Sequence, residues 1–136
     1  MSWTCPTCGR IFKAPSQWHS CHSRDIEEHI ETKPVFIQDI IYALLDYCEG
    51  LGKHDVRSLK TSIILRTKAN FLSILPRKTY VGLEFQLPYE TEGEQLTKQV
   101  RISGKRLYST ARIHSIDEFD DIVKKWIRDS NKLINV

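Results

Sequence analysis

Three cysteines and two histidines lie within the first 22 residues, and their spacing is typical of a zinc site. In Cys5-Pro6-Thr7-Cys8-Gly9 the two thiols are two residues apart, so both can bind one ion while the glycine leaves backbone amides free to bond sulfur. The remaining ligands come from Trp18-His19-Ser20-Cys21-His22. We predict one Zn²⁺ ion bound by Cys5, Cys8, His19 and Cys21, with His22 as the reserve histidine.

Four protein ligands would complete the coordination of the ion, and closed zinc sites support structure rather than activate water. The alternative is that these are ordinary cysteine thiols, but their crowding around a Cys-Pro-x-Cys-Gly turn favours a metal. Cys48 differs, because it continues the apolar stripe of a predicted helix four residues after Leu44. We interpret Cys48 as a small core residue rather than as a fifth ligand or a nucleophile.

Two amphipathic helices and four strands must position any other site. Apolar residues at three- and four-residue spacing predict a helix over 34–49. A second apolar stripe predicts a closing helix over about 118–132, begun either by a Ser115/Glu118 capping box or by an Asp117 cap.

Between the helices the hydrophobic period changes to two, which predicts strands with one apolar face each. The strands extend over Leu59 to Leu65, Val81 to Leu87, Val100 to Ile102 and Leu107 to Ile113. We expect a tight hairpin at Ser103-Gly104, a looser hairpin over Tyr89–Gln95, and a crossover over Ala69–Pro76 that is too short for a βαβ unit. The predicted fold class is therefore α+β: a two-layer sandwich of a four-stranded, mainly antiparallel sheet with two helices on one face, plus a small N-terminal zinc-binding finger.

The formal net charge of the 136 residues is only +3, but it is unevenly distributed. Residues 51–115 carry 12 basic and 5 acidic side chains, a net +7, whereas the segments before and after them carry −3 and −1. If the apolar side chains face the helices, alternation sends a basic and aromatic set to the open face of the sheet. This set is Lys60, Arg66, Tyr80, Arg101, Tyr108 and Arg112.

A basic sheet face with interleaved tyrosines suits single-stranded nucleic acid or an RNA loop, because cations neutralise phosphates and tyrosines stack on bases. The alternative is a solvated face, or one that docks another protein, and Glu84 and Ile64 on the same face favour that interpretation. A third hypothesis is an enzyme that uses His114 or His54, each of which has an aspartate nearby in sequence. No phosphate-binding glycine loop or nucleophile elbow supports it.

The N-terminal segment also resembles a known family. Trp3-x-Cys5-Pro6-x-Cys8-Gly9-Arg10-x-Phe12, followed by Gln17-x-His19-Ser20-Cys21, is similar to the CPxCGRxF…QxHSC element of prokaryotic proteins that carry a small α+β domain of unknown function. The resemblance covers about residues 3–22 and 34–133. It implies the same four zinc ligands and an intracellular prokaryotic source, and it implies no activity, although some members are fused to nucleic-acid-processing modules.

These observations predict a zinc-binding finger over residues 1–24, a linker or short helix over 25–33, and an α+β domain over 34–136. The expected function is a zinc-binding module that binds nucleic acid, and the alternative is a protein-interaction adaptor whose zinc is purely structural. No apolar run approaches the roughly 18 residues of a membrane span, and no signal peptide is recognisable. We therefore expect a cytoplasmic protein with no membrane partner.

Overall fold

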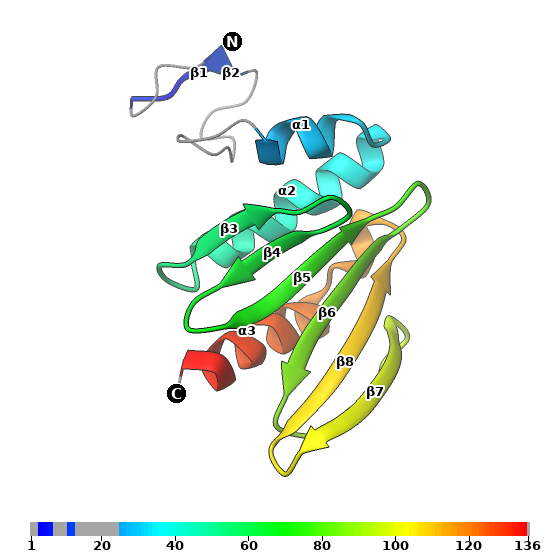
Figure 1. Cartoon of the computed structure of the whole chain (residues 1–136). Coiled ribbons are helices and arrows are strands. Elements are labelled where there is room, and N and C mark those ends of the chain that lie inside the picture. The colour runs from blue at the N-terminus through cyan, green and yellow to red at the C-terminus, as the bar shows by residue number, and fades with distance from the viewer. Residues whose placement is uncertain (1–2, 7–10, 13–24, 136) are drawn as a thin grey trace.

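Six antiparallel strands form one sheet, and the described helices cover one of its faces and leave the other open (Figure 1). The computed structural model describes residues 3–6, 11–12 and 25–135. Its elements are β1 (Trp3–Thr4), β2 (Ile11–Phe12), α1 (Asp25–Glu31), α2 (Val35–Glu49), β3 (Asp55–Ser58), β4 (Ile63–Arg66), β5 (Asn70–Pro76), β6 (Val81–Leu87), β7 (Leu96–Ser103), β8 (Arg106–Ile113), the 3-10 helix η1 (Ile116–Glu118) and α3 (Asp121–Asn135). The α+β class and the antiparallel sheet are confirmed. The large sheet has six strands rather than the predicted four, and its order is β3-β4-β5-β6-β8-β7.

The segment predicted as one strand over Leu59–Leu65 is part of a hairpin. β3 and β4 pair along their whole length, and the Leu59 amide donates to the Ser62 carbonyl at 2.8 Å. This bond closes a tight turn, so only the second half of the predicted strand is extended.

The segment Ala69–Pro76, predicted as a crossover, contains the central strand β5. Phe71 and Leu72 are adjacent in sequence, yet both are almost completely buried. Phe71 lies at a shift in the register between β4 and β5, where Leu65 pairs with Leu72 and Arg66 pairs with Asn70. This irregularity interrupts the apolar–polar alternation by which the other strands were predicted.

The looser hairpin predicted over Tyr89–Gln95 is also wrong, because β8 lies between β6 and β7. β8 pairs with β6 over seven residues, from Val81↔Ile113 to Leu87↔Leu107. Its apolar face is buried, whereas Val100 and Ile102 of β7 are 45% and 60% exposed. The more apolar strand therefore takes the central place and β7 forms the edge, with the predicted tight turn at Gly104 joining the two.

The two long helices form the second layer of the fold. α2 buries the stripe that predicted it, including Cys48, which is fully buried as expected. α3 packs on β5 and β6, and its Trp126 ring stacks on Phe85 at a centroid distance of 5.7 Å. Where β5 and β6 separate, the buried Ser130 hydroxyl donates to the Phe71 carbonyl (2.6 Å) and accepts from the Gln86 amide (3.1 Å). α3 thus completes the hydrogen bonding of two strands as well as covering them.

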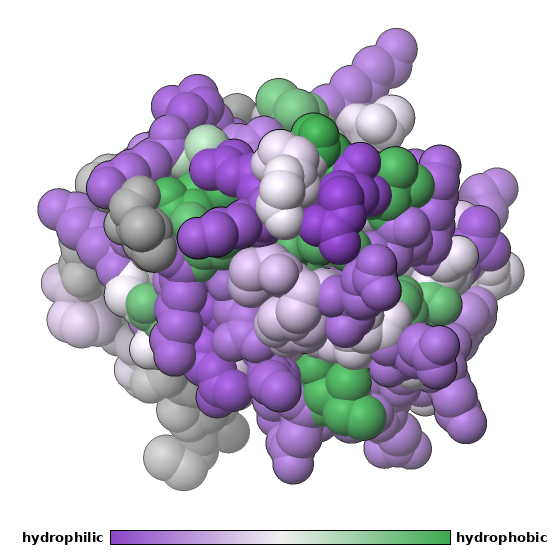
Figure 2. Space-filling view, turned by 90° about the horizontal axis from the view of Figure 1, so that it is seen from below, coloured by the Kyte–Doolittle hydropathy of each residue, from purple (hydrophilic) through white to green (hydrophobic). Residues whose placement is uncertain are grey.

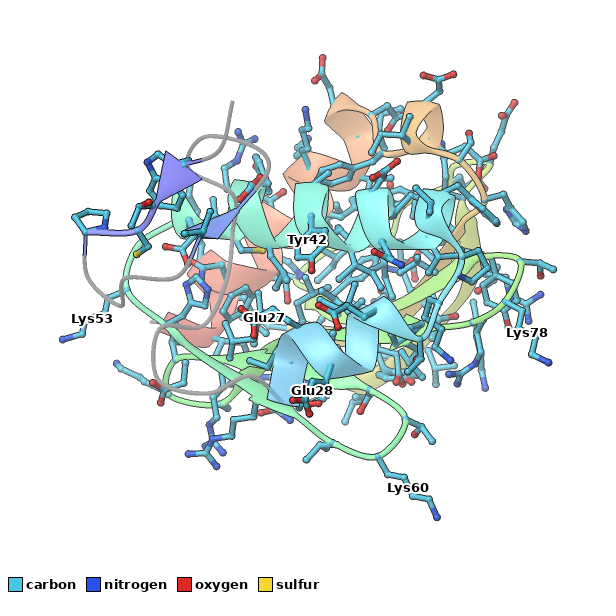
Figure 3. All side chains as sticks on the ribbon, turned by 90° about the horizontal axis from the view of Figure 1, so that it is seen from above. Glu27, Glu28, Tyr42, Lys53, Lys60 and Lys78 are labelled. Atoms are coloured by element: carbon cyan, nitrogen blue, oxygen red, sulfur yellow. The ribbon has the colours of Figure 1, made fainter. Side chains whose placement is uncertain are left out.

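Residues 25–33, predicted as a linker or a short helix, contain helix α1. Its Ile26 and Ile30 are buried in the core cluster, so α1 is part of the packed domain. Glu27 on the same helix lies close to Tyr42 of α2 (Figure 3). Burial, with the nearby charges of Glu27 and Glu31, raises the pKa of the Tyr42 hydroxyl.

Candidate nucleic-acid interface

The register of the sheet defines which side chains share its open face. Apart from Gly82, the buried residues of β6 and β8 face the helices, and the residues between them face the other way. One row across the open face joins Arg57, Ile64, Ser73, Glu84, Thr110 and Lys98, and a second joins Leu75, Gly82 and Arg112. Arg66 and Tyr108 follow the same alternation.

The structure brings two of the predicted residues into direct contact. The Arg112 guanidinium carbon lies 4.6 Å from the centre of the Tyr80 ring, a cation–π geometry. Tyr80 itself precedes β6 in a turn whose Arg77 amide donates to the Tyr80 carbonyl at 3.1 Å. The imidazole of His114 lies against the same ring, with centroids 5.7 Å apart and the planes tilted by 45°.

A shallow depression of about 260 Å³ adjoins this contact on the open face. Its lining includes Arg77, Tyr80, Gly82, Glu84 and Arg112. Leu75 approaches Gly82 closely at the floor, because a β-carbon at position 82 would lie only 3.3 Å from the β-carbon of Leu75. An isolated glycine inside a strand pattern is a known signal of close approach, so this position could have been recognised in the sequence.

Arg101 does not share the open face, and that prediction is wrong. It pairs with Leu107, which is buried on the helix side, whereas its neighbour Val100 pairs with Tyr108. The Arg101 guanidinium forms an exposed ion pair with Glu90 at 3.5 Å. The cause is a break in the register of β7, which has irregularities on both sides of residues 98–101, so alternation counted through Ile102 gives the wrong face.

Lys60 lies in the turn between β3 and β4 rather than on a strand, and Figure 3 shows its side chain extending away from the body of the molecule. Arg57 and Lys98, which the sequence analysis did not select, take places in the open-face row instead. The sheet face of either residue could not be predicted without knowing its pairing partner, because the residue type alone does not indicate the face of a basic residue near a strand end.

The two histidines of the enzyme hypothesis lie at opposite ends of the sheet. His54 precedes β3 beside the first residues of β5, whereas His114 follows β8 beside the end of β5. The backbone amide of His114 donates to Glu118 Oε1 at 2.6 Å, and its Nδ1 lies 3.2 Å from the same oxygen. Glu118, and not Asp117, is therefore the carboxylate partner of His114.

Only part of the predicted metal site belongs to the described residues. Cys5 is 4% exposed and follows β1, which pairs with β2 in the register Trp3↔Phe12 and Thr4↔Ile11. Cys8, His19, Cys21 and the reserve His22 lie outside the described residues. Among those described, no three potential ligands gather around one point.

The fold and the open face define a two-layer α+β protein with an antiparallel sheet. A family model described as "Domain of unknown function (DUF5655)" matches residues 26–133, so the chain belongs to this family. No curated protein and no solved structure matches the chain. In the described part of the chain, no helix combines the length and apolar character that a membrane crossing requires.

Proposed function

We propose that this protein is a zinc-binding module that binds single-stranded nucleic acid or an RNA loop at the open face of its sheet. The observation that carries the proposal is Arg112, which is stacked on Tyr80 and has no carboxylate partner within the described residues. In this position its N–H groups are available to a phosphate, and the depression beside it can receive a base.

Further positive charge surrounds Arg112. The Arg77 guanidinium lines the same depression and donates to the carbonyl oxygens of Thr61 and Pro76 at 3.4 and 3.1 Å. Carbonyl acceptors hold a guanidinium in place without neutralising it, so the charge of Arg77 also remains available to an anion. Lys98 and Arg57 lie at the two ends of the neighbouring row, which has Glu84 between them.

The proposal includes a zinc finger at the N-terminus, with Cys5, Cys8, His19 and Cys21 as ligands. The described part fits this assignment, because Cys5 is buried and the paired strands β1 and β2 precede and follow Cys8 in the sequence. Zn²⁺ with four protein ligands would stabilise the finger and leave no position for substrate. Thiolate ligands suit a reducing compartment such as the cytoplasm, and the family resemblance favours a prokaryotic source.

The experiment compares Arg112→Gln with Arg101→Gln in the full chain. Both changes remove one positive charge from an exposed arginine near the same hairpin, but only Arg112 lies on the open face. Binding of fluorescein-labelled single-stranded DNA and RNA is measured by anisotropy over a series of salt concentrations.

We expect wild-type affinity to fall steeply with salt, and Arg112→Gln to weaken binding about tenfold and lower the salt slope by about one. Arg101→Gln should change affinity by less than about twofold. Absence of binding at low salt, or equal effects of the two variants, would contradict the proposal.

The alternative is a protein-interaction adaptor, and one observation favours it. The edge strand β7 exposes Val100 and Ile102, and edge strands can pair with an added strand. On the face seen in Figure 2, however, hydrophobic residues form separate small patches within a mostly hydrophilic surface. If Val100→Lys weakened oligonucleotide binding as much as Arg112→Gln, we would extend the binding surface to the edge strand β7.

A further inference from the structure

We propose that the depression at Gly82 is a subsite for one base of the bound strand and that it prefers guanine. This inference rests on the proposed function and names the base that the open face selects. The inference depends on three features of the depression: its two opposite charges, the glycine at its floor and its size.

The charges come from Arg112 and Glu84, which both line the depression. Glu84 and Arg112 are close to each other, as diagonal neighbours on the adjacent strands β6 and β8. Even so, neither side chain forms an ion pair or a hydrogen bond with any residue that the structure describes. Opposite charges that do not neutralise each other within one depression suit a ligand with both an anionic group and a hydrogen-bond donor. A nucleotide has both, because its phosphate is anionic and its base has N–H groups.

The floor of the depression suits a planar ring. Leu75, Gly82 and Arg112 are direct cross-strand neighbours, and a β-carbon at position 82 would lie only 3.3 Å from the β-carbon of Leu75. The floor at Gly82 is therefore backbone, with an alkyl group on one side and a guanidinium on the other. A base on this floor would contact Leu75 with one part of its surface while its phosphate lies near Arg112.

The size of the depression favours part of a chain over a complete small molecule. At about 260 Å³ it is smaller than the roughly 300 Å³ at which pockets for drug-sized ligands begin. A strand whose phosphates also contact Arg77 needs only one base to enter the depression.

Glu84 supplies the base preference. An ionised carboxylate only accepts hydrogen bonds, and its two oxygens match two parallel donors. Guanine presents adjacent N1–H and N2–H donors on its Watson–Crick edge, whereas adenine and cytosine present one donor beside an acceptor and uracil places its donor between two carbonyls. Guanine is therefore the base that a carboxylate at this position binds best.

The test uses short, labelled oligoadenylate RNAs that differ at one central position, which is adenine, inosine or guanine. Inosine keeps N1–H and lacks the N2 amino group, so we expect affinity to rise from adenine to inosine to guanine, by about tenfold in total. In Glu84→Gln the order should disappear, because an amide presents a donor as well as an acceptor. Glu92→Gln, an equal charge change in the exposed loop before β7, is the matched control and should keep the order.

A second variant, Gly82→Val, fills the floor with a side chain that strands accept, and its folding is verified by the thermal unfolding midpoint. We expect it to lose the guanine preference. Equal binding of the three RNAs in the wild type, with Arg112→Gln still weakening all of them, overturns the inference and leaves the proposed function intact. Failure of every RNA to bind overturns both, and competition by free GMP as strong as by the guanine-containing RNA overturns the assignment to a strand.

Discussion

At the scale of single residues, Cys48 shows how burial controls reactivity. Its side chain is fully buried on α2, and burial raises the pKa of its thiol from 9.0 to about 12. When the pH lies between these two pKa values, the thiol keeps its proton in the native state but loses it in the unfolded chain. The contribution of this group to stability is therefore complete below pH 9 and is lost as the pH rises toward 12.

We predict that the difference in unfolding free energy between the wild type and Cys48→Ala narrows above pH 9, by up to about 1.4 kcal/mol per pH unit. Urea denaturation of both proteins from pH 7 upward measures this difference, and groups common to both cancel. A difference that stays constant with pH would show that the native thiol titrates like an exposed one.

At the scale of elements, the start of α3 depends on Asp120. Its Oδ1 accepts from the Val123 amide at 3.1 Å, and its carbonyl accepts from the Lys124 amide at 3.0 Å, which is the geometry of a helix N-cap. The predicted caps are not used in this way: Ser115 makes no capping hydrogen bond, and Glu118 bonds the His114 amide.

We predict that Asp120→Ala lowers the unfolding free energy by about 1 kcal/mol, and that Asp120→Asn, which keeps the acceptor, has a smaller effect. Ser115→Ala is the control and should stay within about 0.5 kcal/mol of the wild type. Chemical denaturation of the four proteins measures their unfolding free energies. A larger decrease in Ser115→Ala than in Asp120→Ala would contradict the assignment of Asp120 as the N-cap.

The elements also show where periodicity succeeds and fails. α2 and β6 were predicted almost to the residue, because each has large apolar side chains at regular spacing on one face that is buried. β5 was missed because adjacent residues are buried, and β7 was misplaced because a break in its register changes which residues face the helices. Hydrophobic periodicity thus predicts elements that have one buried face and one more accessible face.

At the scale of the whole molecule, the proposed zinc finger and the α+β domain should respond differently to loss of metal. The core cluster begins at Ile26, and Cys5 is not part of it although it is buried. A domain with its own core does not require a metal to fold.

We predict that the purified protein contains one zinc ion per chain, and that chelation changes the unfolding free energy of the main transition by less than about 1 kcal/mol. Cys8→Ser, Cys21→Ser and His19→Ala should lose the zinc, whereas His22→Ala and the control Cys48→Ala should retain it. Elemental analysis of each variant measures the content. If His19→Ala retained the zinc and His22→Ala lost it, His22 and not His19 would be the histidine ligand.

The sequence by itself determined the α+β class, both long helices, the burial of Cys48 and the basic character of the middle of the chain, because these depend on local spacing and composition. The zinc ligands remain a prediction from spacing, since three of the four lie outside the described residues. Only the tertiary structure decided the strand order, the separation of Arg101 from Arg112, and the placing of Glu84, Gly82 and Arg112 in one depression. These depend on which strands pair and in what register, which is set by burial energies summed over residues far apart in the chain.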